Sequence, residues 1–264
     1  MARRWSCVAP ARTRGSHHDP LPARSVALVT GGSRGIGAAI SRRLAADGHA
    51  VAINYAGRRD DAEALAAELN AAGAQAVALQ ADVSDPQAVR QLFDAIEARF
   101  GGIDVVVNSA GVLQLAPLAD CDDALFDRVI GINLKGAFNV LRESARRVRD
   151  GGRLITLSTS VVGIRLENYS VYAASKAAVE TMGAILSKEL RGCNITVNAV
   201  APRTDRHRSV PGWKIAGADR AVGEDDPLER LGTPDDIAGA VGFLAGADGG
   251  WINGQVLRAN GGMV

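Results

Sequence analysis

Tyr172 and Lys176 are the pair of residues in this sequence whose types and spacing most directly indicate chemistry. They stand four residues apart in an Ala-rich segment, so on a helix both side chains lie on one face. A phenol with its ordinary pKa of about 10 is a weak acid, and a neighbouring ammonium group stabilises the phenolate and lowers that pKa. Such a tyrosine can give and take a proton near neutral pH. The pair therefore predicts a general acid/base at Tyr172.

Tyr169, three residues before Tyr172, is the alternative candidate. Four residues after Tyr169 the chain has Ala173, which supplies no ammonium group, so Tyr172 is the better candidate. A Tyr-x-x-x-Lys spacing is common by chance, and an isolated match could mark an exposed tyrosine beside a surface lysine. In this chain the pair follows an apolar run whose end carries hydroxyl groups, at Ser158, Thr159 and Ser160. This context favours a catalytic pair.

A glycine-rich turn is the second feature that could do chemistry. It ends a β-branched run, opens a segment of helical period, and reads Thr30-Gly31-Gly32-Ser33-Arg34-Gly35-Ile36-Gly37. Glycines let the backbone turn sharply and approach a pyrophosphate, while the following helix offers free N–H groups and the positive end of its dipole. Alone, such a turn could be purely structural. Between a strand and a helix it predicts a dinucleotide-binding site.

The end of the second predicted strand indicates which dinucleotide fits. An Asp or Glu there would accept a hydrogen bond from the ribose 2′-hydroxyl and repel a 2′-phosphate. Here the first acid is Asp60, and both Arg34 and Arg58 can reach a 2′-phosphate, although Arg58 could equally be a solvated residue at a helix start. NADP(H) is therefore the expected cofactor. The binding residues expected from this strand end are Asn54, Tyr55, Ala56 and Arg58.

The order and spacing of these motifs resemble those of the short-chain dehydrogenase/reductase family, whose glycine turn reads TGxxxGxG and whose catalytic pair reads YxxxK. The resemblance covers Ser25 to Pro202 and resumes from Pro227 to Gly262, and the pattern is similar to 3-ketoacyl-acyl-carrier-protein reductases. It implies an NADP(H)-dependent oxidoreductase that reduces a ketone or aldehyde to an alcohol by reversible hydride transfer. In the family, an Arg at the position of Arg34 accompanies NADP.

The resemblance also implies two further catalytic residues. The family's serine lies 12 or 13 residues before the tyrosine, at Ser160 or Thr159, and the run VVG that follows favours Ser160. Its hydroxyl would orient and polarise the substrate oxygen. Asn133 stands in the run GINLKG, where the family keeps an asparagine to bind a water that relays protons through the lysine. The implied catalytic set is Asn133, Ser160, Tyr172 and Lys176.

Further cofactor contacts are implied at the ends of the third, fourth and sixth predicted strands. Asp82 and Val83 match the family's adenine-contacting pair, although Asp82 could instead cap a helix. The run NSAG at 108–111 matches the family's NNAG with one change, and its asparagine can also tie neighbouring strands together. The contacts implied here and at the catalytic pair are Asn108, Ala110, Gly111, Tyr172, Lys176 and Pro202.

Apolar runs alternate with longer Ala-rich segments of helical period, and this alternation predicts the fold. Strands are expected at 26–30, 50–54, 74–80, 103–108, 152–158, 194–200 and 253–259, and helices at 35–47, 60–72, 86–100, 122–148 and 171–190. Most of the strands are apolar on both faces, as in a parallel sheet covered by helices. The prediction is an α/β, Rossmann-type, doubly wound seven-stranded parallel sheet in a single domain at 25–264. Residues 1–24 are expected to form a disordered basic N-terminal extension.

Composition excludes several classes of function. The formal net charge is +1, which argues against a nucleic-acid or membrane-surface partner. No apolar run approaches the length of about 20 residues that a membrane span needs. The three cysteines show no metal-ligand spacing, so no metal site is expected. A cytoplasmic enzyme acting on a small-molecule carbonyl or alcohol is the expectation.

The chain departs from the family pattern after Pro202, where Arg203 replaces a glycine. Segment 203–226 is polar with poor helical period, so it is either a lid suited to a polar or acidic ligand or a segment altered by a local reading-frame error. The departure leaves the contact to the nicotinamide carboxamide unassigned, with Thr204 as a candidate. Alternatives to a carbonyl reductase are a sugar or polyol NAD(P) dehydrogenase and a catalytically impaired NADP-binding protein.

Family members of this length usually assemble through surfaces that can be located in this chain. They pair through two long helices, here 122–148 and 171–190, and through the C-terminal strand around Val256. Both helical segments carry Ala-rich stretches that can pack closely. A homotetramer is expected, with a dimer as the second choice.

Overall fold

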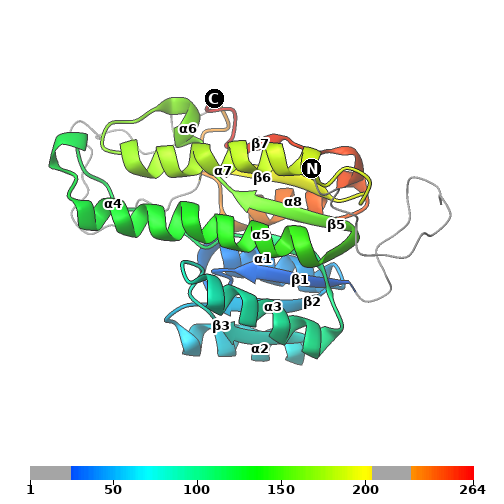
Figure 1. Cartoon of the computed structure of the whole chain (residues 1–264). Coiled ribbons are helices and arrows are strands. Elements are labelled where there is room, and N and C mark those ends of the chain that lie inside the picture. The colour runs from blue at the N-terminus through cyan, green and yellow to red at the C-terminus, as the bar shows by residue number, and fades with distance from the viewer. Residues whose placement is uncertain (1–24, 204–226) are drawn as a thin grey trace, which may run out of the picture.

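A seven-stranded sheet forms the centre of the computed structural model, which describes residues 25–203 and 227–264 (Figure 1). All neighbouring strands are parallel, in the order β3-β2-β1-β4-β5-β6-β7. The strands are β1 (Val26–Thr30), β2 (Ala50–Tyr55), β3 (Ala76–Gln80), β4 (Ile103–Asn108), β5 (Val148–Leu157), β6 (Thr196–Pro202) and β7 (Val256–Ala259). The predicted fold class is therefore confirmed.

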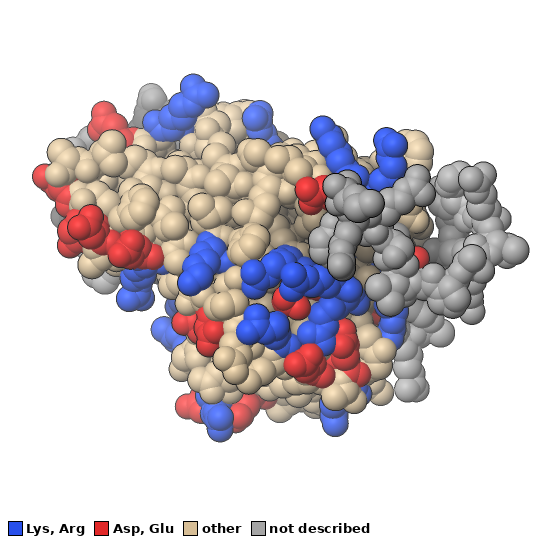
Figure 2. Space-filling view, in the orientation of Figure 1, with Lys and Arg blue, Asp and Glu red and all other residues tan. Residues whose placement is uncertain are grey.

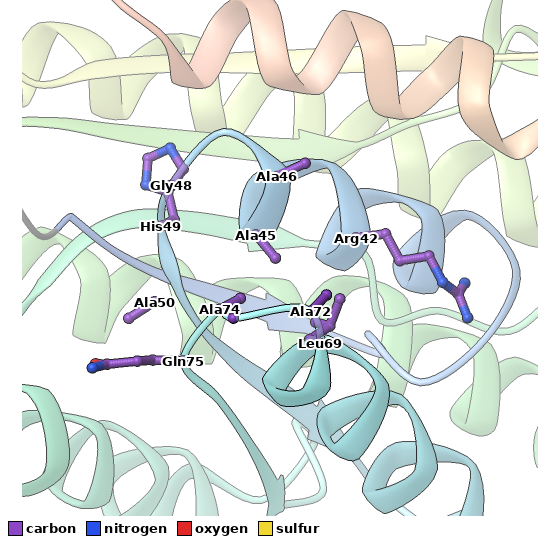
Figure 3. A pocket seen from close by; sticks show the side chains of 11 residues that line it. Arg42, Ala45, Ala46, Gly48, His49, Ala50, Leu69, Ala72, Ala74 and Gln75 are labelled. Carbon is purple, nitrogen blue, oxygen red and sulfur yellow. The ribbon is translucent and has the colours of Figure 1, made fainter.

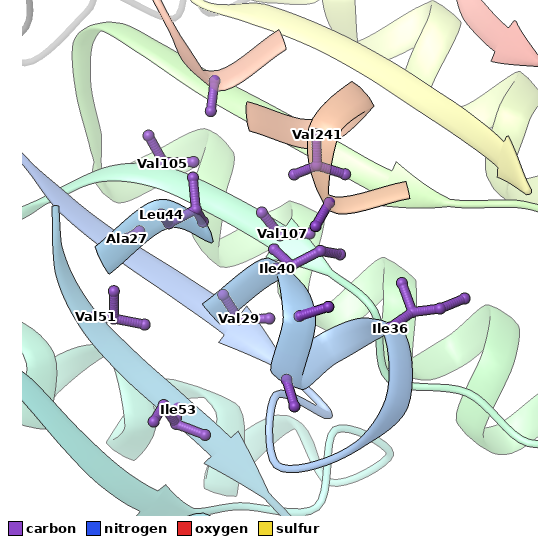
Figure 4. Close-up of a cluster of buried hydrophobic side chains, with 14 of the residues drawn as sticks. Ala27, Val29, Ile36, Ile40, Leu44, Val51, Ile53, Val105, Val107 and Val241 are labelled. Carbon is purple, nitrogen blue, oxygen red and sulfur yellow. The ribbon is translucent and has the colours of Figure 1, made fainter. Parts of the chain in front are cut away.

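Helices cover both faces of the sheet. On one face lie α1 (Gly35–Ala46), α2 (Arg59–Ala71) and α8 (Pro234–Ala245), and on the other lie α3 (Pro86–Phe100), α5 (Ala137–Arg147) and α7 (Ser170–Glu189). Because both faces of the strands β1, β2 and β4 are covered, every residue of these strands is buried and the sequence shows no alternation there. Figure 4 shows the hydrophobic core between the sheet and the helices α1, α2 and α8, where Ile40 of α1 lies near Val29 of β1 and Val241 of α8.

Shorter elements complete the described part of the chain. They are α4 (Asp123–Ile130), α6 (Val161–Ile164), the 3₁₀ turns η1 (Leu118–Asp120) and η4 (Asp248–Trp251), and the π-helical turn η2 (Gly131–Gly136). None of the helices in the described ranges is long and apolar enough to span a bilayer.

The strand order reverses at β1, which pairs with β2 on one side and with β4 on the other. In an open parallel sheet, the loops that follow the two strands at such a reversal, here β1 and β4, diverge to opposite faces and open a crevice at the carboxyl ends of the strands. The glycine turn follows β1 and the run NSAG follows β4. The fold thus brings the two predicted cofactor loops to the same crevice.

The structure departs from the predicted elements in several places. The helix expected at 122–148 is α4, η2 and α5 in continuous succession, with a π turn in the middle. Strand β5 begins at Val148 rather than at 152, and β7 begins at Val256 rather than at 253. Helix α8 was not predicted, because its sequence PDDIAGAVGFLA is nearly apolar after the first turn and has little periodicity. Its N-terminus nonetheless carries a capping box between Thr233 and Asp236.

Ion pairs lock α3 and α5 together on the face seen in Figure 2. Basic side chains gather there across the middle of the molecule, with acidic side chains beside them. Arg147 of α5 lies 2.6 Å from Asp94 and 2.5 Å from Glu97, both on α3. These pairs join two neighbouring helices on the face opposite α1 and α8.

Candidate active site

Close backbone contacts define the glycine turn between β1 and α1. A Cβ atom on Gly37 would lie 2.2 Å from the carbonyl oxygen of Gly31, so α1 packs directly on the turn. Gly31 has a φ of +60°, and a Cβ there would lie 3.0 Å from Cα of Ala110 in the loop after β4. Glycine is therefore required at both positions.

The N-terminus of α1 is open to a ligand. Among the described residues no side chain caps this end, and the first turn contains no acid. Gly35 has a φ of +52°, and a Cβ there would meet no atom of the described residues within 4 Å. Ser33 is half-buried, Arg34 is exposed, and Ile36 anchors the helix in the core. Free N–H groups at a helix terminus with open space before them fit a pyrophosphate.

The end of β2 divides the predicted cofactor residues into two kinds. Asn54 and Tyr55 are buried, and the Asn54 amide is used within the protein: its oxygen accepts from Gly31 N–H (3.4 Å) and its nitrogen donates to Ala81 O (3.0 Å). Asn54 thus fastens the glycine turn to β2 and β3. Ala56 and Arg58 are exposed, and Arg58 pairs with Asp61 at 3.3 Å. No acid intervenes between β2 and α2, so the strand end fits a 2′-phosphate.

Asp82 and Val83 follow β3 and lie beside the crevice. Asp82 is exposed, and its carboxylate accepts from the N–H and the hydroxyl of Ser84, both at 2.8 Å. It does not cap α3, because the N-cap residue is Asp85, whose side chain accepts from Gln87 N–H. Val83 is buried against Gly136, where a Cβ would lie 2.7 Å from the valine Cγ2.

Tyr172 and Lys176 lie on the first two turns of α7, and both are buried. The Lys176 ammonium donates to the carbonyl of Leu157 at the end of β5 (2.8 Å) and lies 5.9 Å from the centre of the Tyr172 ring. A Cβ on Gly111 would lie 3.4 Å from the Lys176 ammonium and 3.2 Å from Oδ1 of Asn133. The small glycine in the loop after β4 therefore lets the lysine and the asparagine approach the same point.

Asn133 is held inside the π turn η2 and is almost fully buried. Its side-chain oxygen accepts from Val112 N–H (2.8 Å), and its amide nitrogen donates to Val112 O (2.9 Å) and to Ser175 Oγ (3.3 Å). These contacts use the side-chain oxygen and both N–H donors of the amide. The amide therefore ties the loop after β4 to α7.

Ser160, the hydroxyl residue predicted to orient the substrate oxygen, lies where β5 turns into α6. It is buried, and its hydroxyl donates to Ala201 O (3.2 Å) while its N–H donates to Pro202 O (3.1 Å), which links the ends of β5 and β6. The Ser158 hydroxyl instead donates to the carboxylate of Glu180 on α7. Thr159 accepts from Val161 N–H (3.3 Å) and so closes the turn into α6.

Comparisons with known proteins match this arrangement over nearly the whole chain. A family model described as enoyl-(acyl carrier protein) reductase matches residues 31–264. A short-chain type dehydrogenase/reductase from Picea abies is 43% identical over 249 residues, which are 90% of this chain and 92% of that protein. The chain belongs to the short-chain dehydrogenase/reductase family.

Two other members of this short-chain dehydrogenase/reductase family carry informative names. The NADPH-dependent aldehyde reductase-like protein, chloroplastic, of Arabidopsis thaliana is 42% identical over 260 residues, which are 93% of this chain and 96% of that protein. A short chain dehydrogenase from Burkholderia cenocepacia, solved in complex with NADP, is 37% identical and superposes with a TM-score of 0.80, covering 90% of this chain and 97% of that one.

Tyr169 and Tyr172 differ sharply in their surroundings in this short-chain dehydrogenase/reductase. Burial raises the pKa of Tyr169 to about 12, and the neighbouring Tyr172 adds to the rise. A phenol with so high a pKa is a poor acid/base near neutral pH. Lys176 lies near Tyr172 on the same helix, whereas Tyr169 precedes the helix. Tyr172 thus stays the predicted acid/base, and Tyr169 is the poorer candidate.

Two residues support the site that the sequence analysis did not assign. Thr30 Oγ1 donates to Asn108 Oδ1 (3.0 Å) and accepts from the N–H groups of Ser109 and Ala110 (both 3.1 Å), so it fixes the loop after β4. Ser175, between the catalytic pair, donates to Tyr172 O (2.7 Å). A polar residue at the end of a buried strand was the available signal for Thr30. Thr204 lies outside the described residues.

A separate cavity of about 600 Å³ lies near the N-terminal ends of β2 and β3, away from the carboxyl ends of the strands (Figure 3). It is lined by the C-terminal ends of α1 and α2 and by the segments that enter β2 and β3, including Ala46, His49 and Gln75. Within the described part of the chain, the residues that line this cavity include none of the predicted site residues. Because ligands of doubly wound sheets bind at the carboxyl ends of the strands, we place the active site in the crevice described above.

Proposed function

We propose that this chain is an NADPH-dependent oxidoreductase that reversibly reduces a ketone or aldehyde to an alcohol, similar to 3-ketoacyl reductases. The observation that carries the proposal is the position of Tyr172 and Lys176 beside the loop after β4, in the crevice where the glycine turn also lies. A phosphate-binding turn and a proton donor at one crevice are the two parts that carbonyl reduction requires.

The cofactor, when bound, supplies the hydride for the reduction. Gly31, Gly35 and Gly37 shape the pyrophosphate site, and Arg34, with Ser33 beside it, is placed for the 2′-phosphate. We expect contacts to the adenine and nicotinamide ends of the cofactor from the loops that follow β3 and β4, at Asp82, Val83, Asn108, Ala110 and Gly111. Pro202, whose carbonyl accepts from Ser160 N–H, is the contact expected after β6. The NADPH-dependent name of the Arabidopsis relative and the NADP complex of the Burkholderia structure support this choice of cofactor.

Each catalytic residue has a defined task in this proposal. The Tyr172 hydroxyl delivers its proton to the carbonyl oxygen of the substrate, and the Lys176 ammonium stabilises the phenolate that remains. When substrate binds, the Ser160 hydroxyl turns from Ala201 O, donates its hydrogen bond to the same substrate oxygen and favours the charge that develops there. Asn133 holds the loop after β4 against α7 and so keeps Lys176 in place.

The activity is tested by NADPH consumption with a panel of small ketones, aldehydes, 3-ketoacyl thioesters, sugars and polyols. We expect turnover with ketones or aldehydes. Turnover with sugars or polyols alone would favour the second candidate, a sugar or polyol NAD(P) dehydrogenase. Tight NADPH binding without any turnover would favour a catalytically impaired NADP-binding protein, the function that the unusual segment 203–226 suggests. We place the enzyme in the cytoplasm.

Cofactor preference is expected to depend on Arg34 and on the absence of an acid after β2. Ala56→Asp places a carboxylate where a 2′-phosphate would lie, so it should erode the preference for NADPH. Arg34→Gln should weaken NADPH binding by about tenfold or more, since a hydrogen bond to a charged group contributes about 1.5–3 kcal/mol. Arg58→Gln should have a smaller effect because Arg58 already pairs with Asp61. Fluorescence titration with both cofactors measures these changes, and equal or tighter NADH binding by the wild type would refute the assignment.

We propose that the chain forms a homotetramer, with a dimer as the second choice. Phe138 on α5 and Ile185 on α7 are 43% and 52% exposed, and Trp251 beside β7 is 88% exposed, so two separate faces carry large apolar side chains. Light scattering at micromolar concentration should give about four times the chain mass of 27.4 kDa. Ile185→Asp should reduce the assembly to dimers, whereas a monomeric wild type would contradict the proposal.

A further inference from the structure

The ring of Tyr169 packs edge-on against the ring of Tyr172. The two ring centres are 6.3 Å apart and the planes meet at 67°, which is the T-shaped geometry that aromatic pairs favour. Tyr169 is 2% exposed, the most deeply buried member of a small apolar cluster at this end of α7. The other members are Val161, Tyr172 and, more loosely packed, Leu113, Leu115 and Ala173.

The backbone on both sides of Tyr169 is fixed. Tyr169 is the N-cap residue of α7, and its carbonyl accepts from Ala173 N–H in the first turn (2.7 Å). The preceding residue, Asn168, has a φ of +68°, and its carbonyl accepts from Ala116 N–H in the loop after β4 (3.2 Å). Leu113 and Leu115 come from this same loop. The Tyr169 ring is therefore held between α7 and the loop that borders the crevice.

A role in proton transfer does not account for this placement. Burial raises the pKa of Tyr169 to about 12, and Ala173 stands where an ammonium would be needed to lower it. The Tyr169 ring contacts the ring of Tyr172, the candidate acid/base. A phenol can rotate about its two side-chain torsions, and a neighbouring ring of fixed position restricts that rotation.

We propose that Tyr169 is a positioning residue, whose ring holds the Tyr172 phenol in the direction from which it reaches the substrate oxygen. The inference rests on the proposed function, because it assumes that Tyr172 is the acid. It assigns the effect to the Tyr169 ring and gives the Tyr169 hydroxyl no part in the proton transfer.

Paired substitutions separate the ring from the hydroxyl. Tyr169→Phe keeps the ring and should retain kcat within about twofold. Tyr169→Leu removes the ring edge and should lower kcat by about 10- to 100-fold, since small misplacements of a reacting group have effects of this size. The Kd for NADPH should stay within about twofold in both variants, because Tyr169 does not shape the phosphate turn. Tyr169→Met, which fills more of the space, serves if the Leu variant does not fold.

Phe93→Leu is the matched control, because Phe93 is a fully buried ring of α3 on the same face of the sheet but outside the site. It should lower the melting temperature without lowering kcat. A Tyr169→Leu enzyme with kcat within twofold of wild type would overturn the inference. Equal losses in Tyr169→Phe and Tyr169→Leu would do so as well, because they would assign the effect to the hydroxyl.

A spectroscopic measurement tests the same inference without turnover. The chain has three tyrosines, so 3-fluorotyrosine labelling gives three ¹⁹F signals, and the Tyr172→Phe variant assigns the one from Tyr172. Tyr169→Phe should leave that signal near its wild-type position, whereas Tyr169→Leu should shift and broaden it. An unchanged signal in Tyr169→Leu would overturn the positioning role. A wild type that reduces no carbonyl would instead overturn the proposed function, so the two failures are distinguishable.

Discussion

Replacement of Tyr172 by phenylalanine is expected to abolish turnover while leaving NADPH binding almost intact. The hydroxyl delivers the proton to the carbonyl oxygen, whereas the ring fills most of the space and remains. General acid/base groups contribute about 10²–10⁴-fold, so kcat should fall by at least about that much. Steady-state rates and a fluorescence titration with NADPH measure the two quantities on the same preparations.

Lys176→Ala distinguishes the acid from its supporting charge. Because the ammonium lies near the Tyr172 ring and close to Gly111, its loss should lower kcat and weaken cofactor binding together.

If Tyr172→Phe kept more than about a tenth of the wild-type rate, less than about 1.4 kcal/mol of barrier would have been lost. Tyr172 would then not be the proton donor.

Gly37→Ala is expected to have the largest effect on cofactor binding. The new Cβ would lie 2.2 Å from the carbonyl oxygen of Gly31, which is backbone and has no free rotation to yield. The turn and the N-terminus of α1 must therefore separate, which disrupts the N–H groups that would hold the pyrophosphate. Overpacking of this kind destabilises a protein by about 1–3 kcal/mol, and each kcal/mol lowers the Tm by about 2–4 °C at this chain length. Affinity for NADPH should fall by about tenfold or more, as measured by titration below the new Tm.

Gly57→Ala is the control for this substitution. Gly57 lies in the loop after β2, where a Cβ would meet no atom of residues 25–203 and 227–264 within 4 Å and the backbone is not left-handed. It should leave both the Tm and the affinity for NADPH close to wild type. If Gly37→Ala bound NADPH as tightly as Gly57→Ala, the glycine turn would not be the pyrophosphate site.

The fold could be predicted from the sequence because its strands are buried on both faces. Runs such as VALVT and IDVVVN are apolar throughout, and each is followed by a segment of helical period that must cover it. Helix α8 escaped prediction for the same physical reason: nine of its twelve residues follow an acidic start with almost no polar face, so the period of 3.6 is absent. The local signals were the capping box at Thr233 and Pro234 at the first helical position.

The candidate site could be predicted in its residue types but not in its contacts. Asn133 was expected from its position in the run GINLKG, yet the π turn that holds it has no periodic signature in the sequence. Asn54 is predicted to touch the cofactor, and the structure adds that its amide fastens the glycine turn to two strands, which the sequence did not indicate. Arg58 was left between two roles, and the ion pair with Asp61 follows from a spacing of three residues at a helix start. Such contacts depend on tertiary geometry.

Transfer of deuterium from labelled cofactor tests the central claim most directly. The wild-type enzyme is incubated with a ketone from the panel and with NADPH that carries deuterium at C4 of the nicotinamide. Mass spectrometry then measures the deuterium content of the product. We expect an alcohol that contains one deuterium at the former carbonyl carbon from one of the two C4-labelled forms, and a rate at least about 10²-fold lower with Tyr172→Phe. An alcohol without deuterium from either form, or no alcohol from any ketone or aldehyde while NADPH still binds, would contradict it.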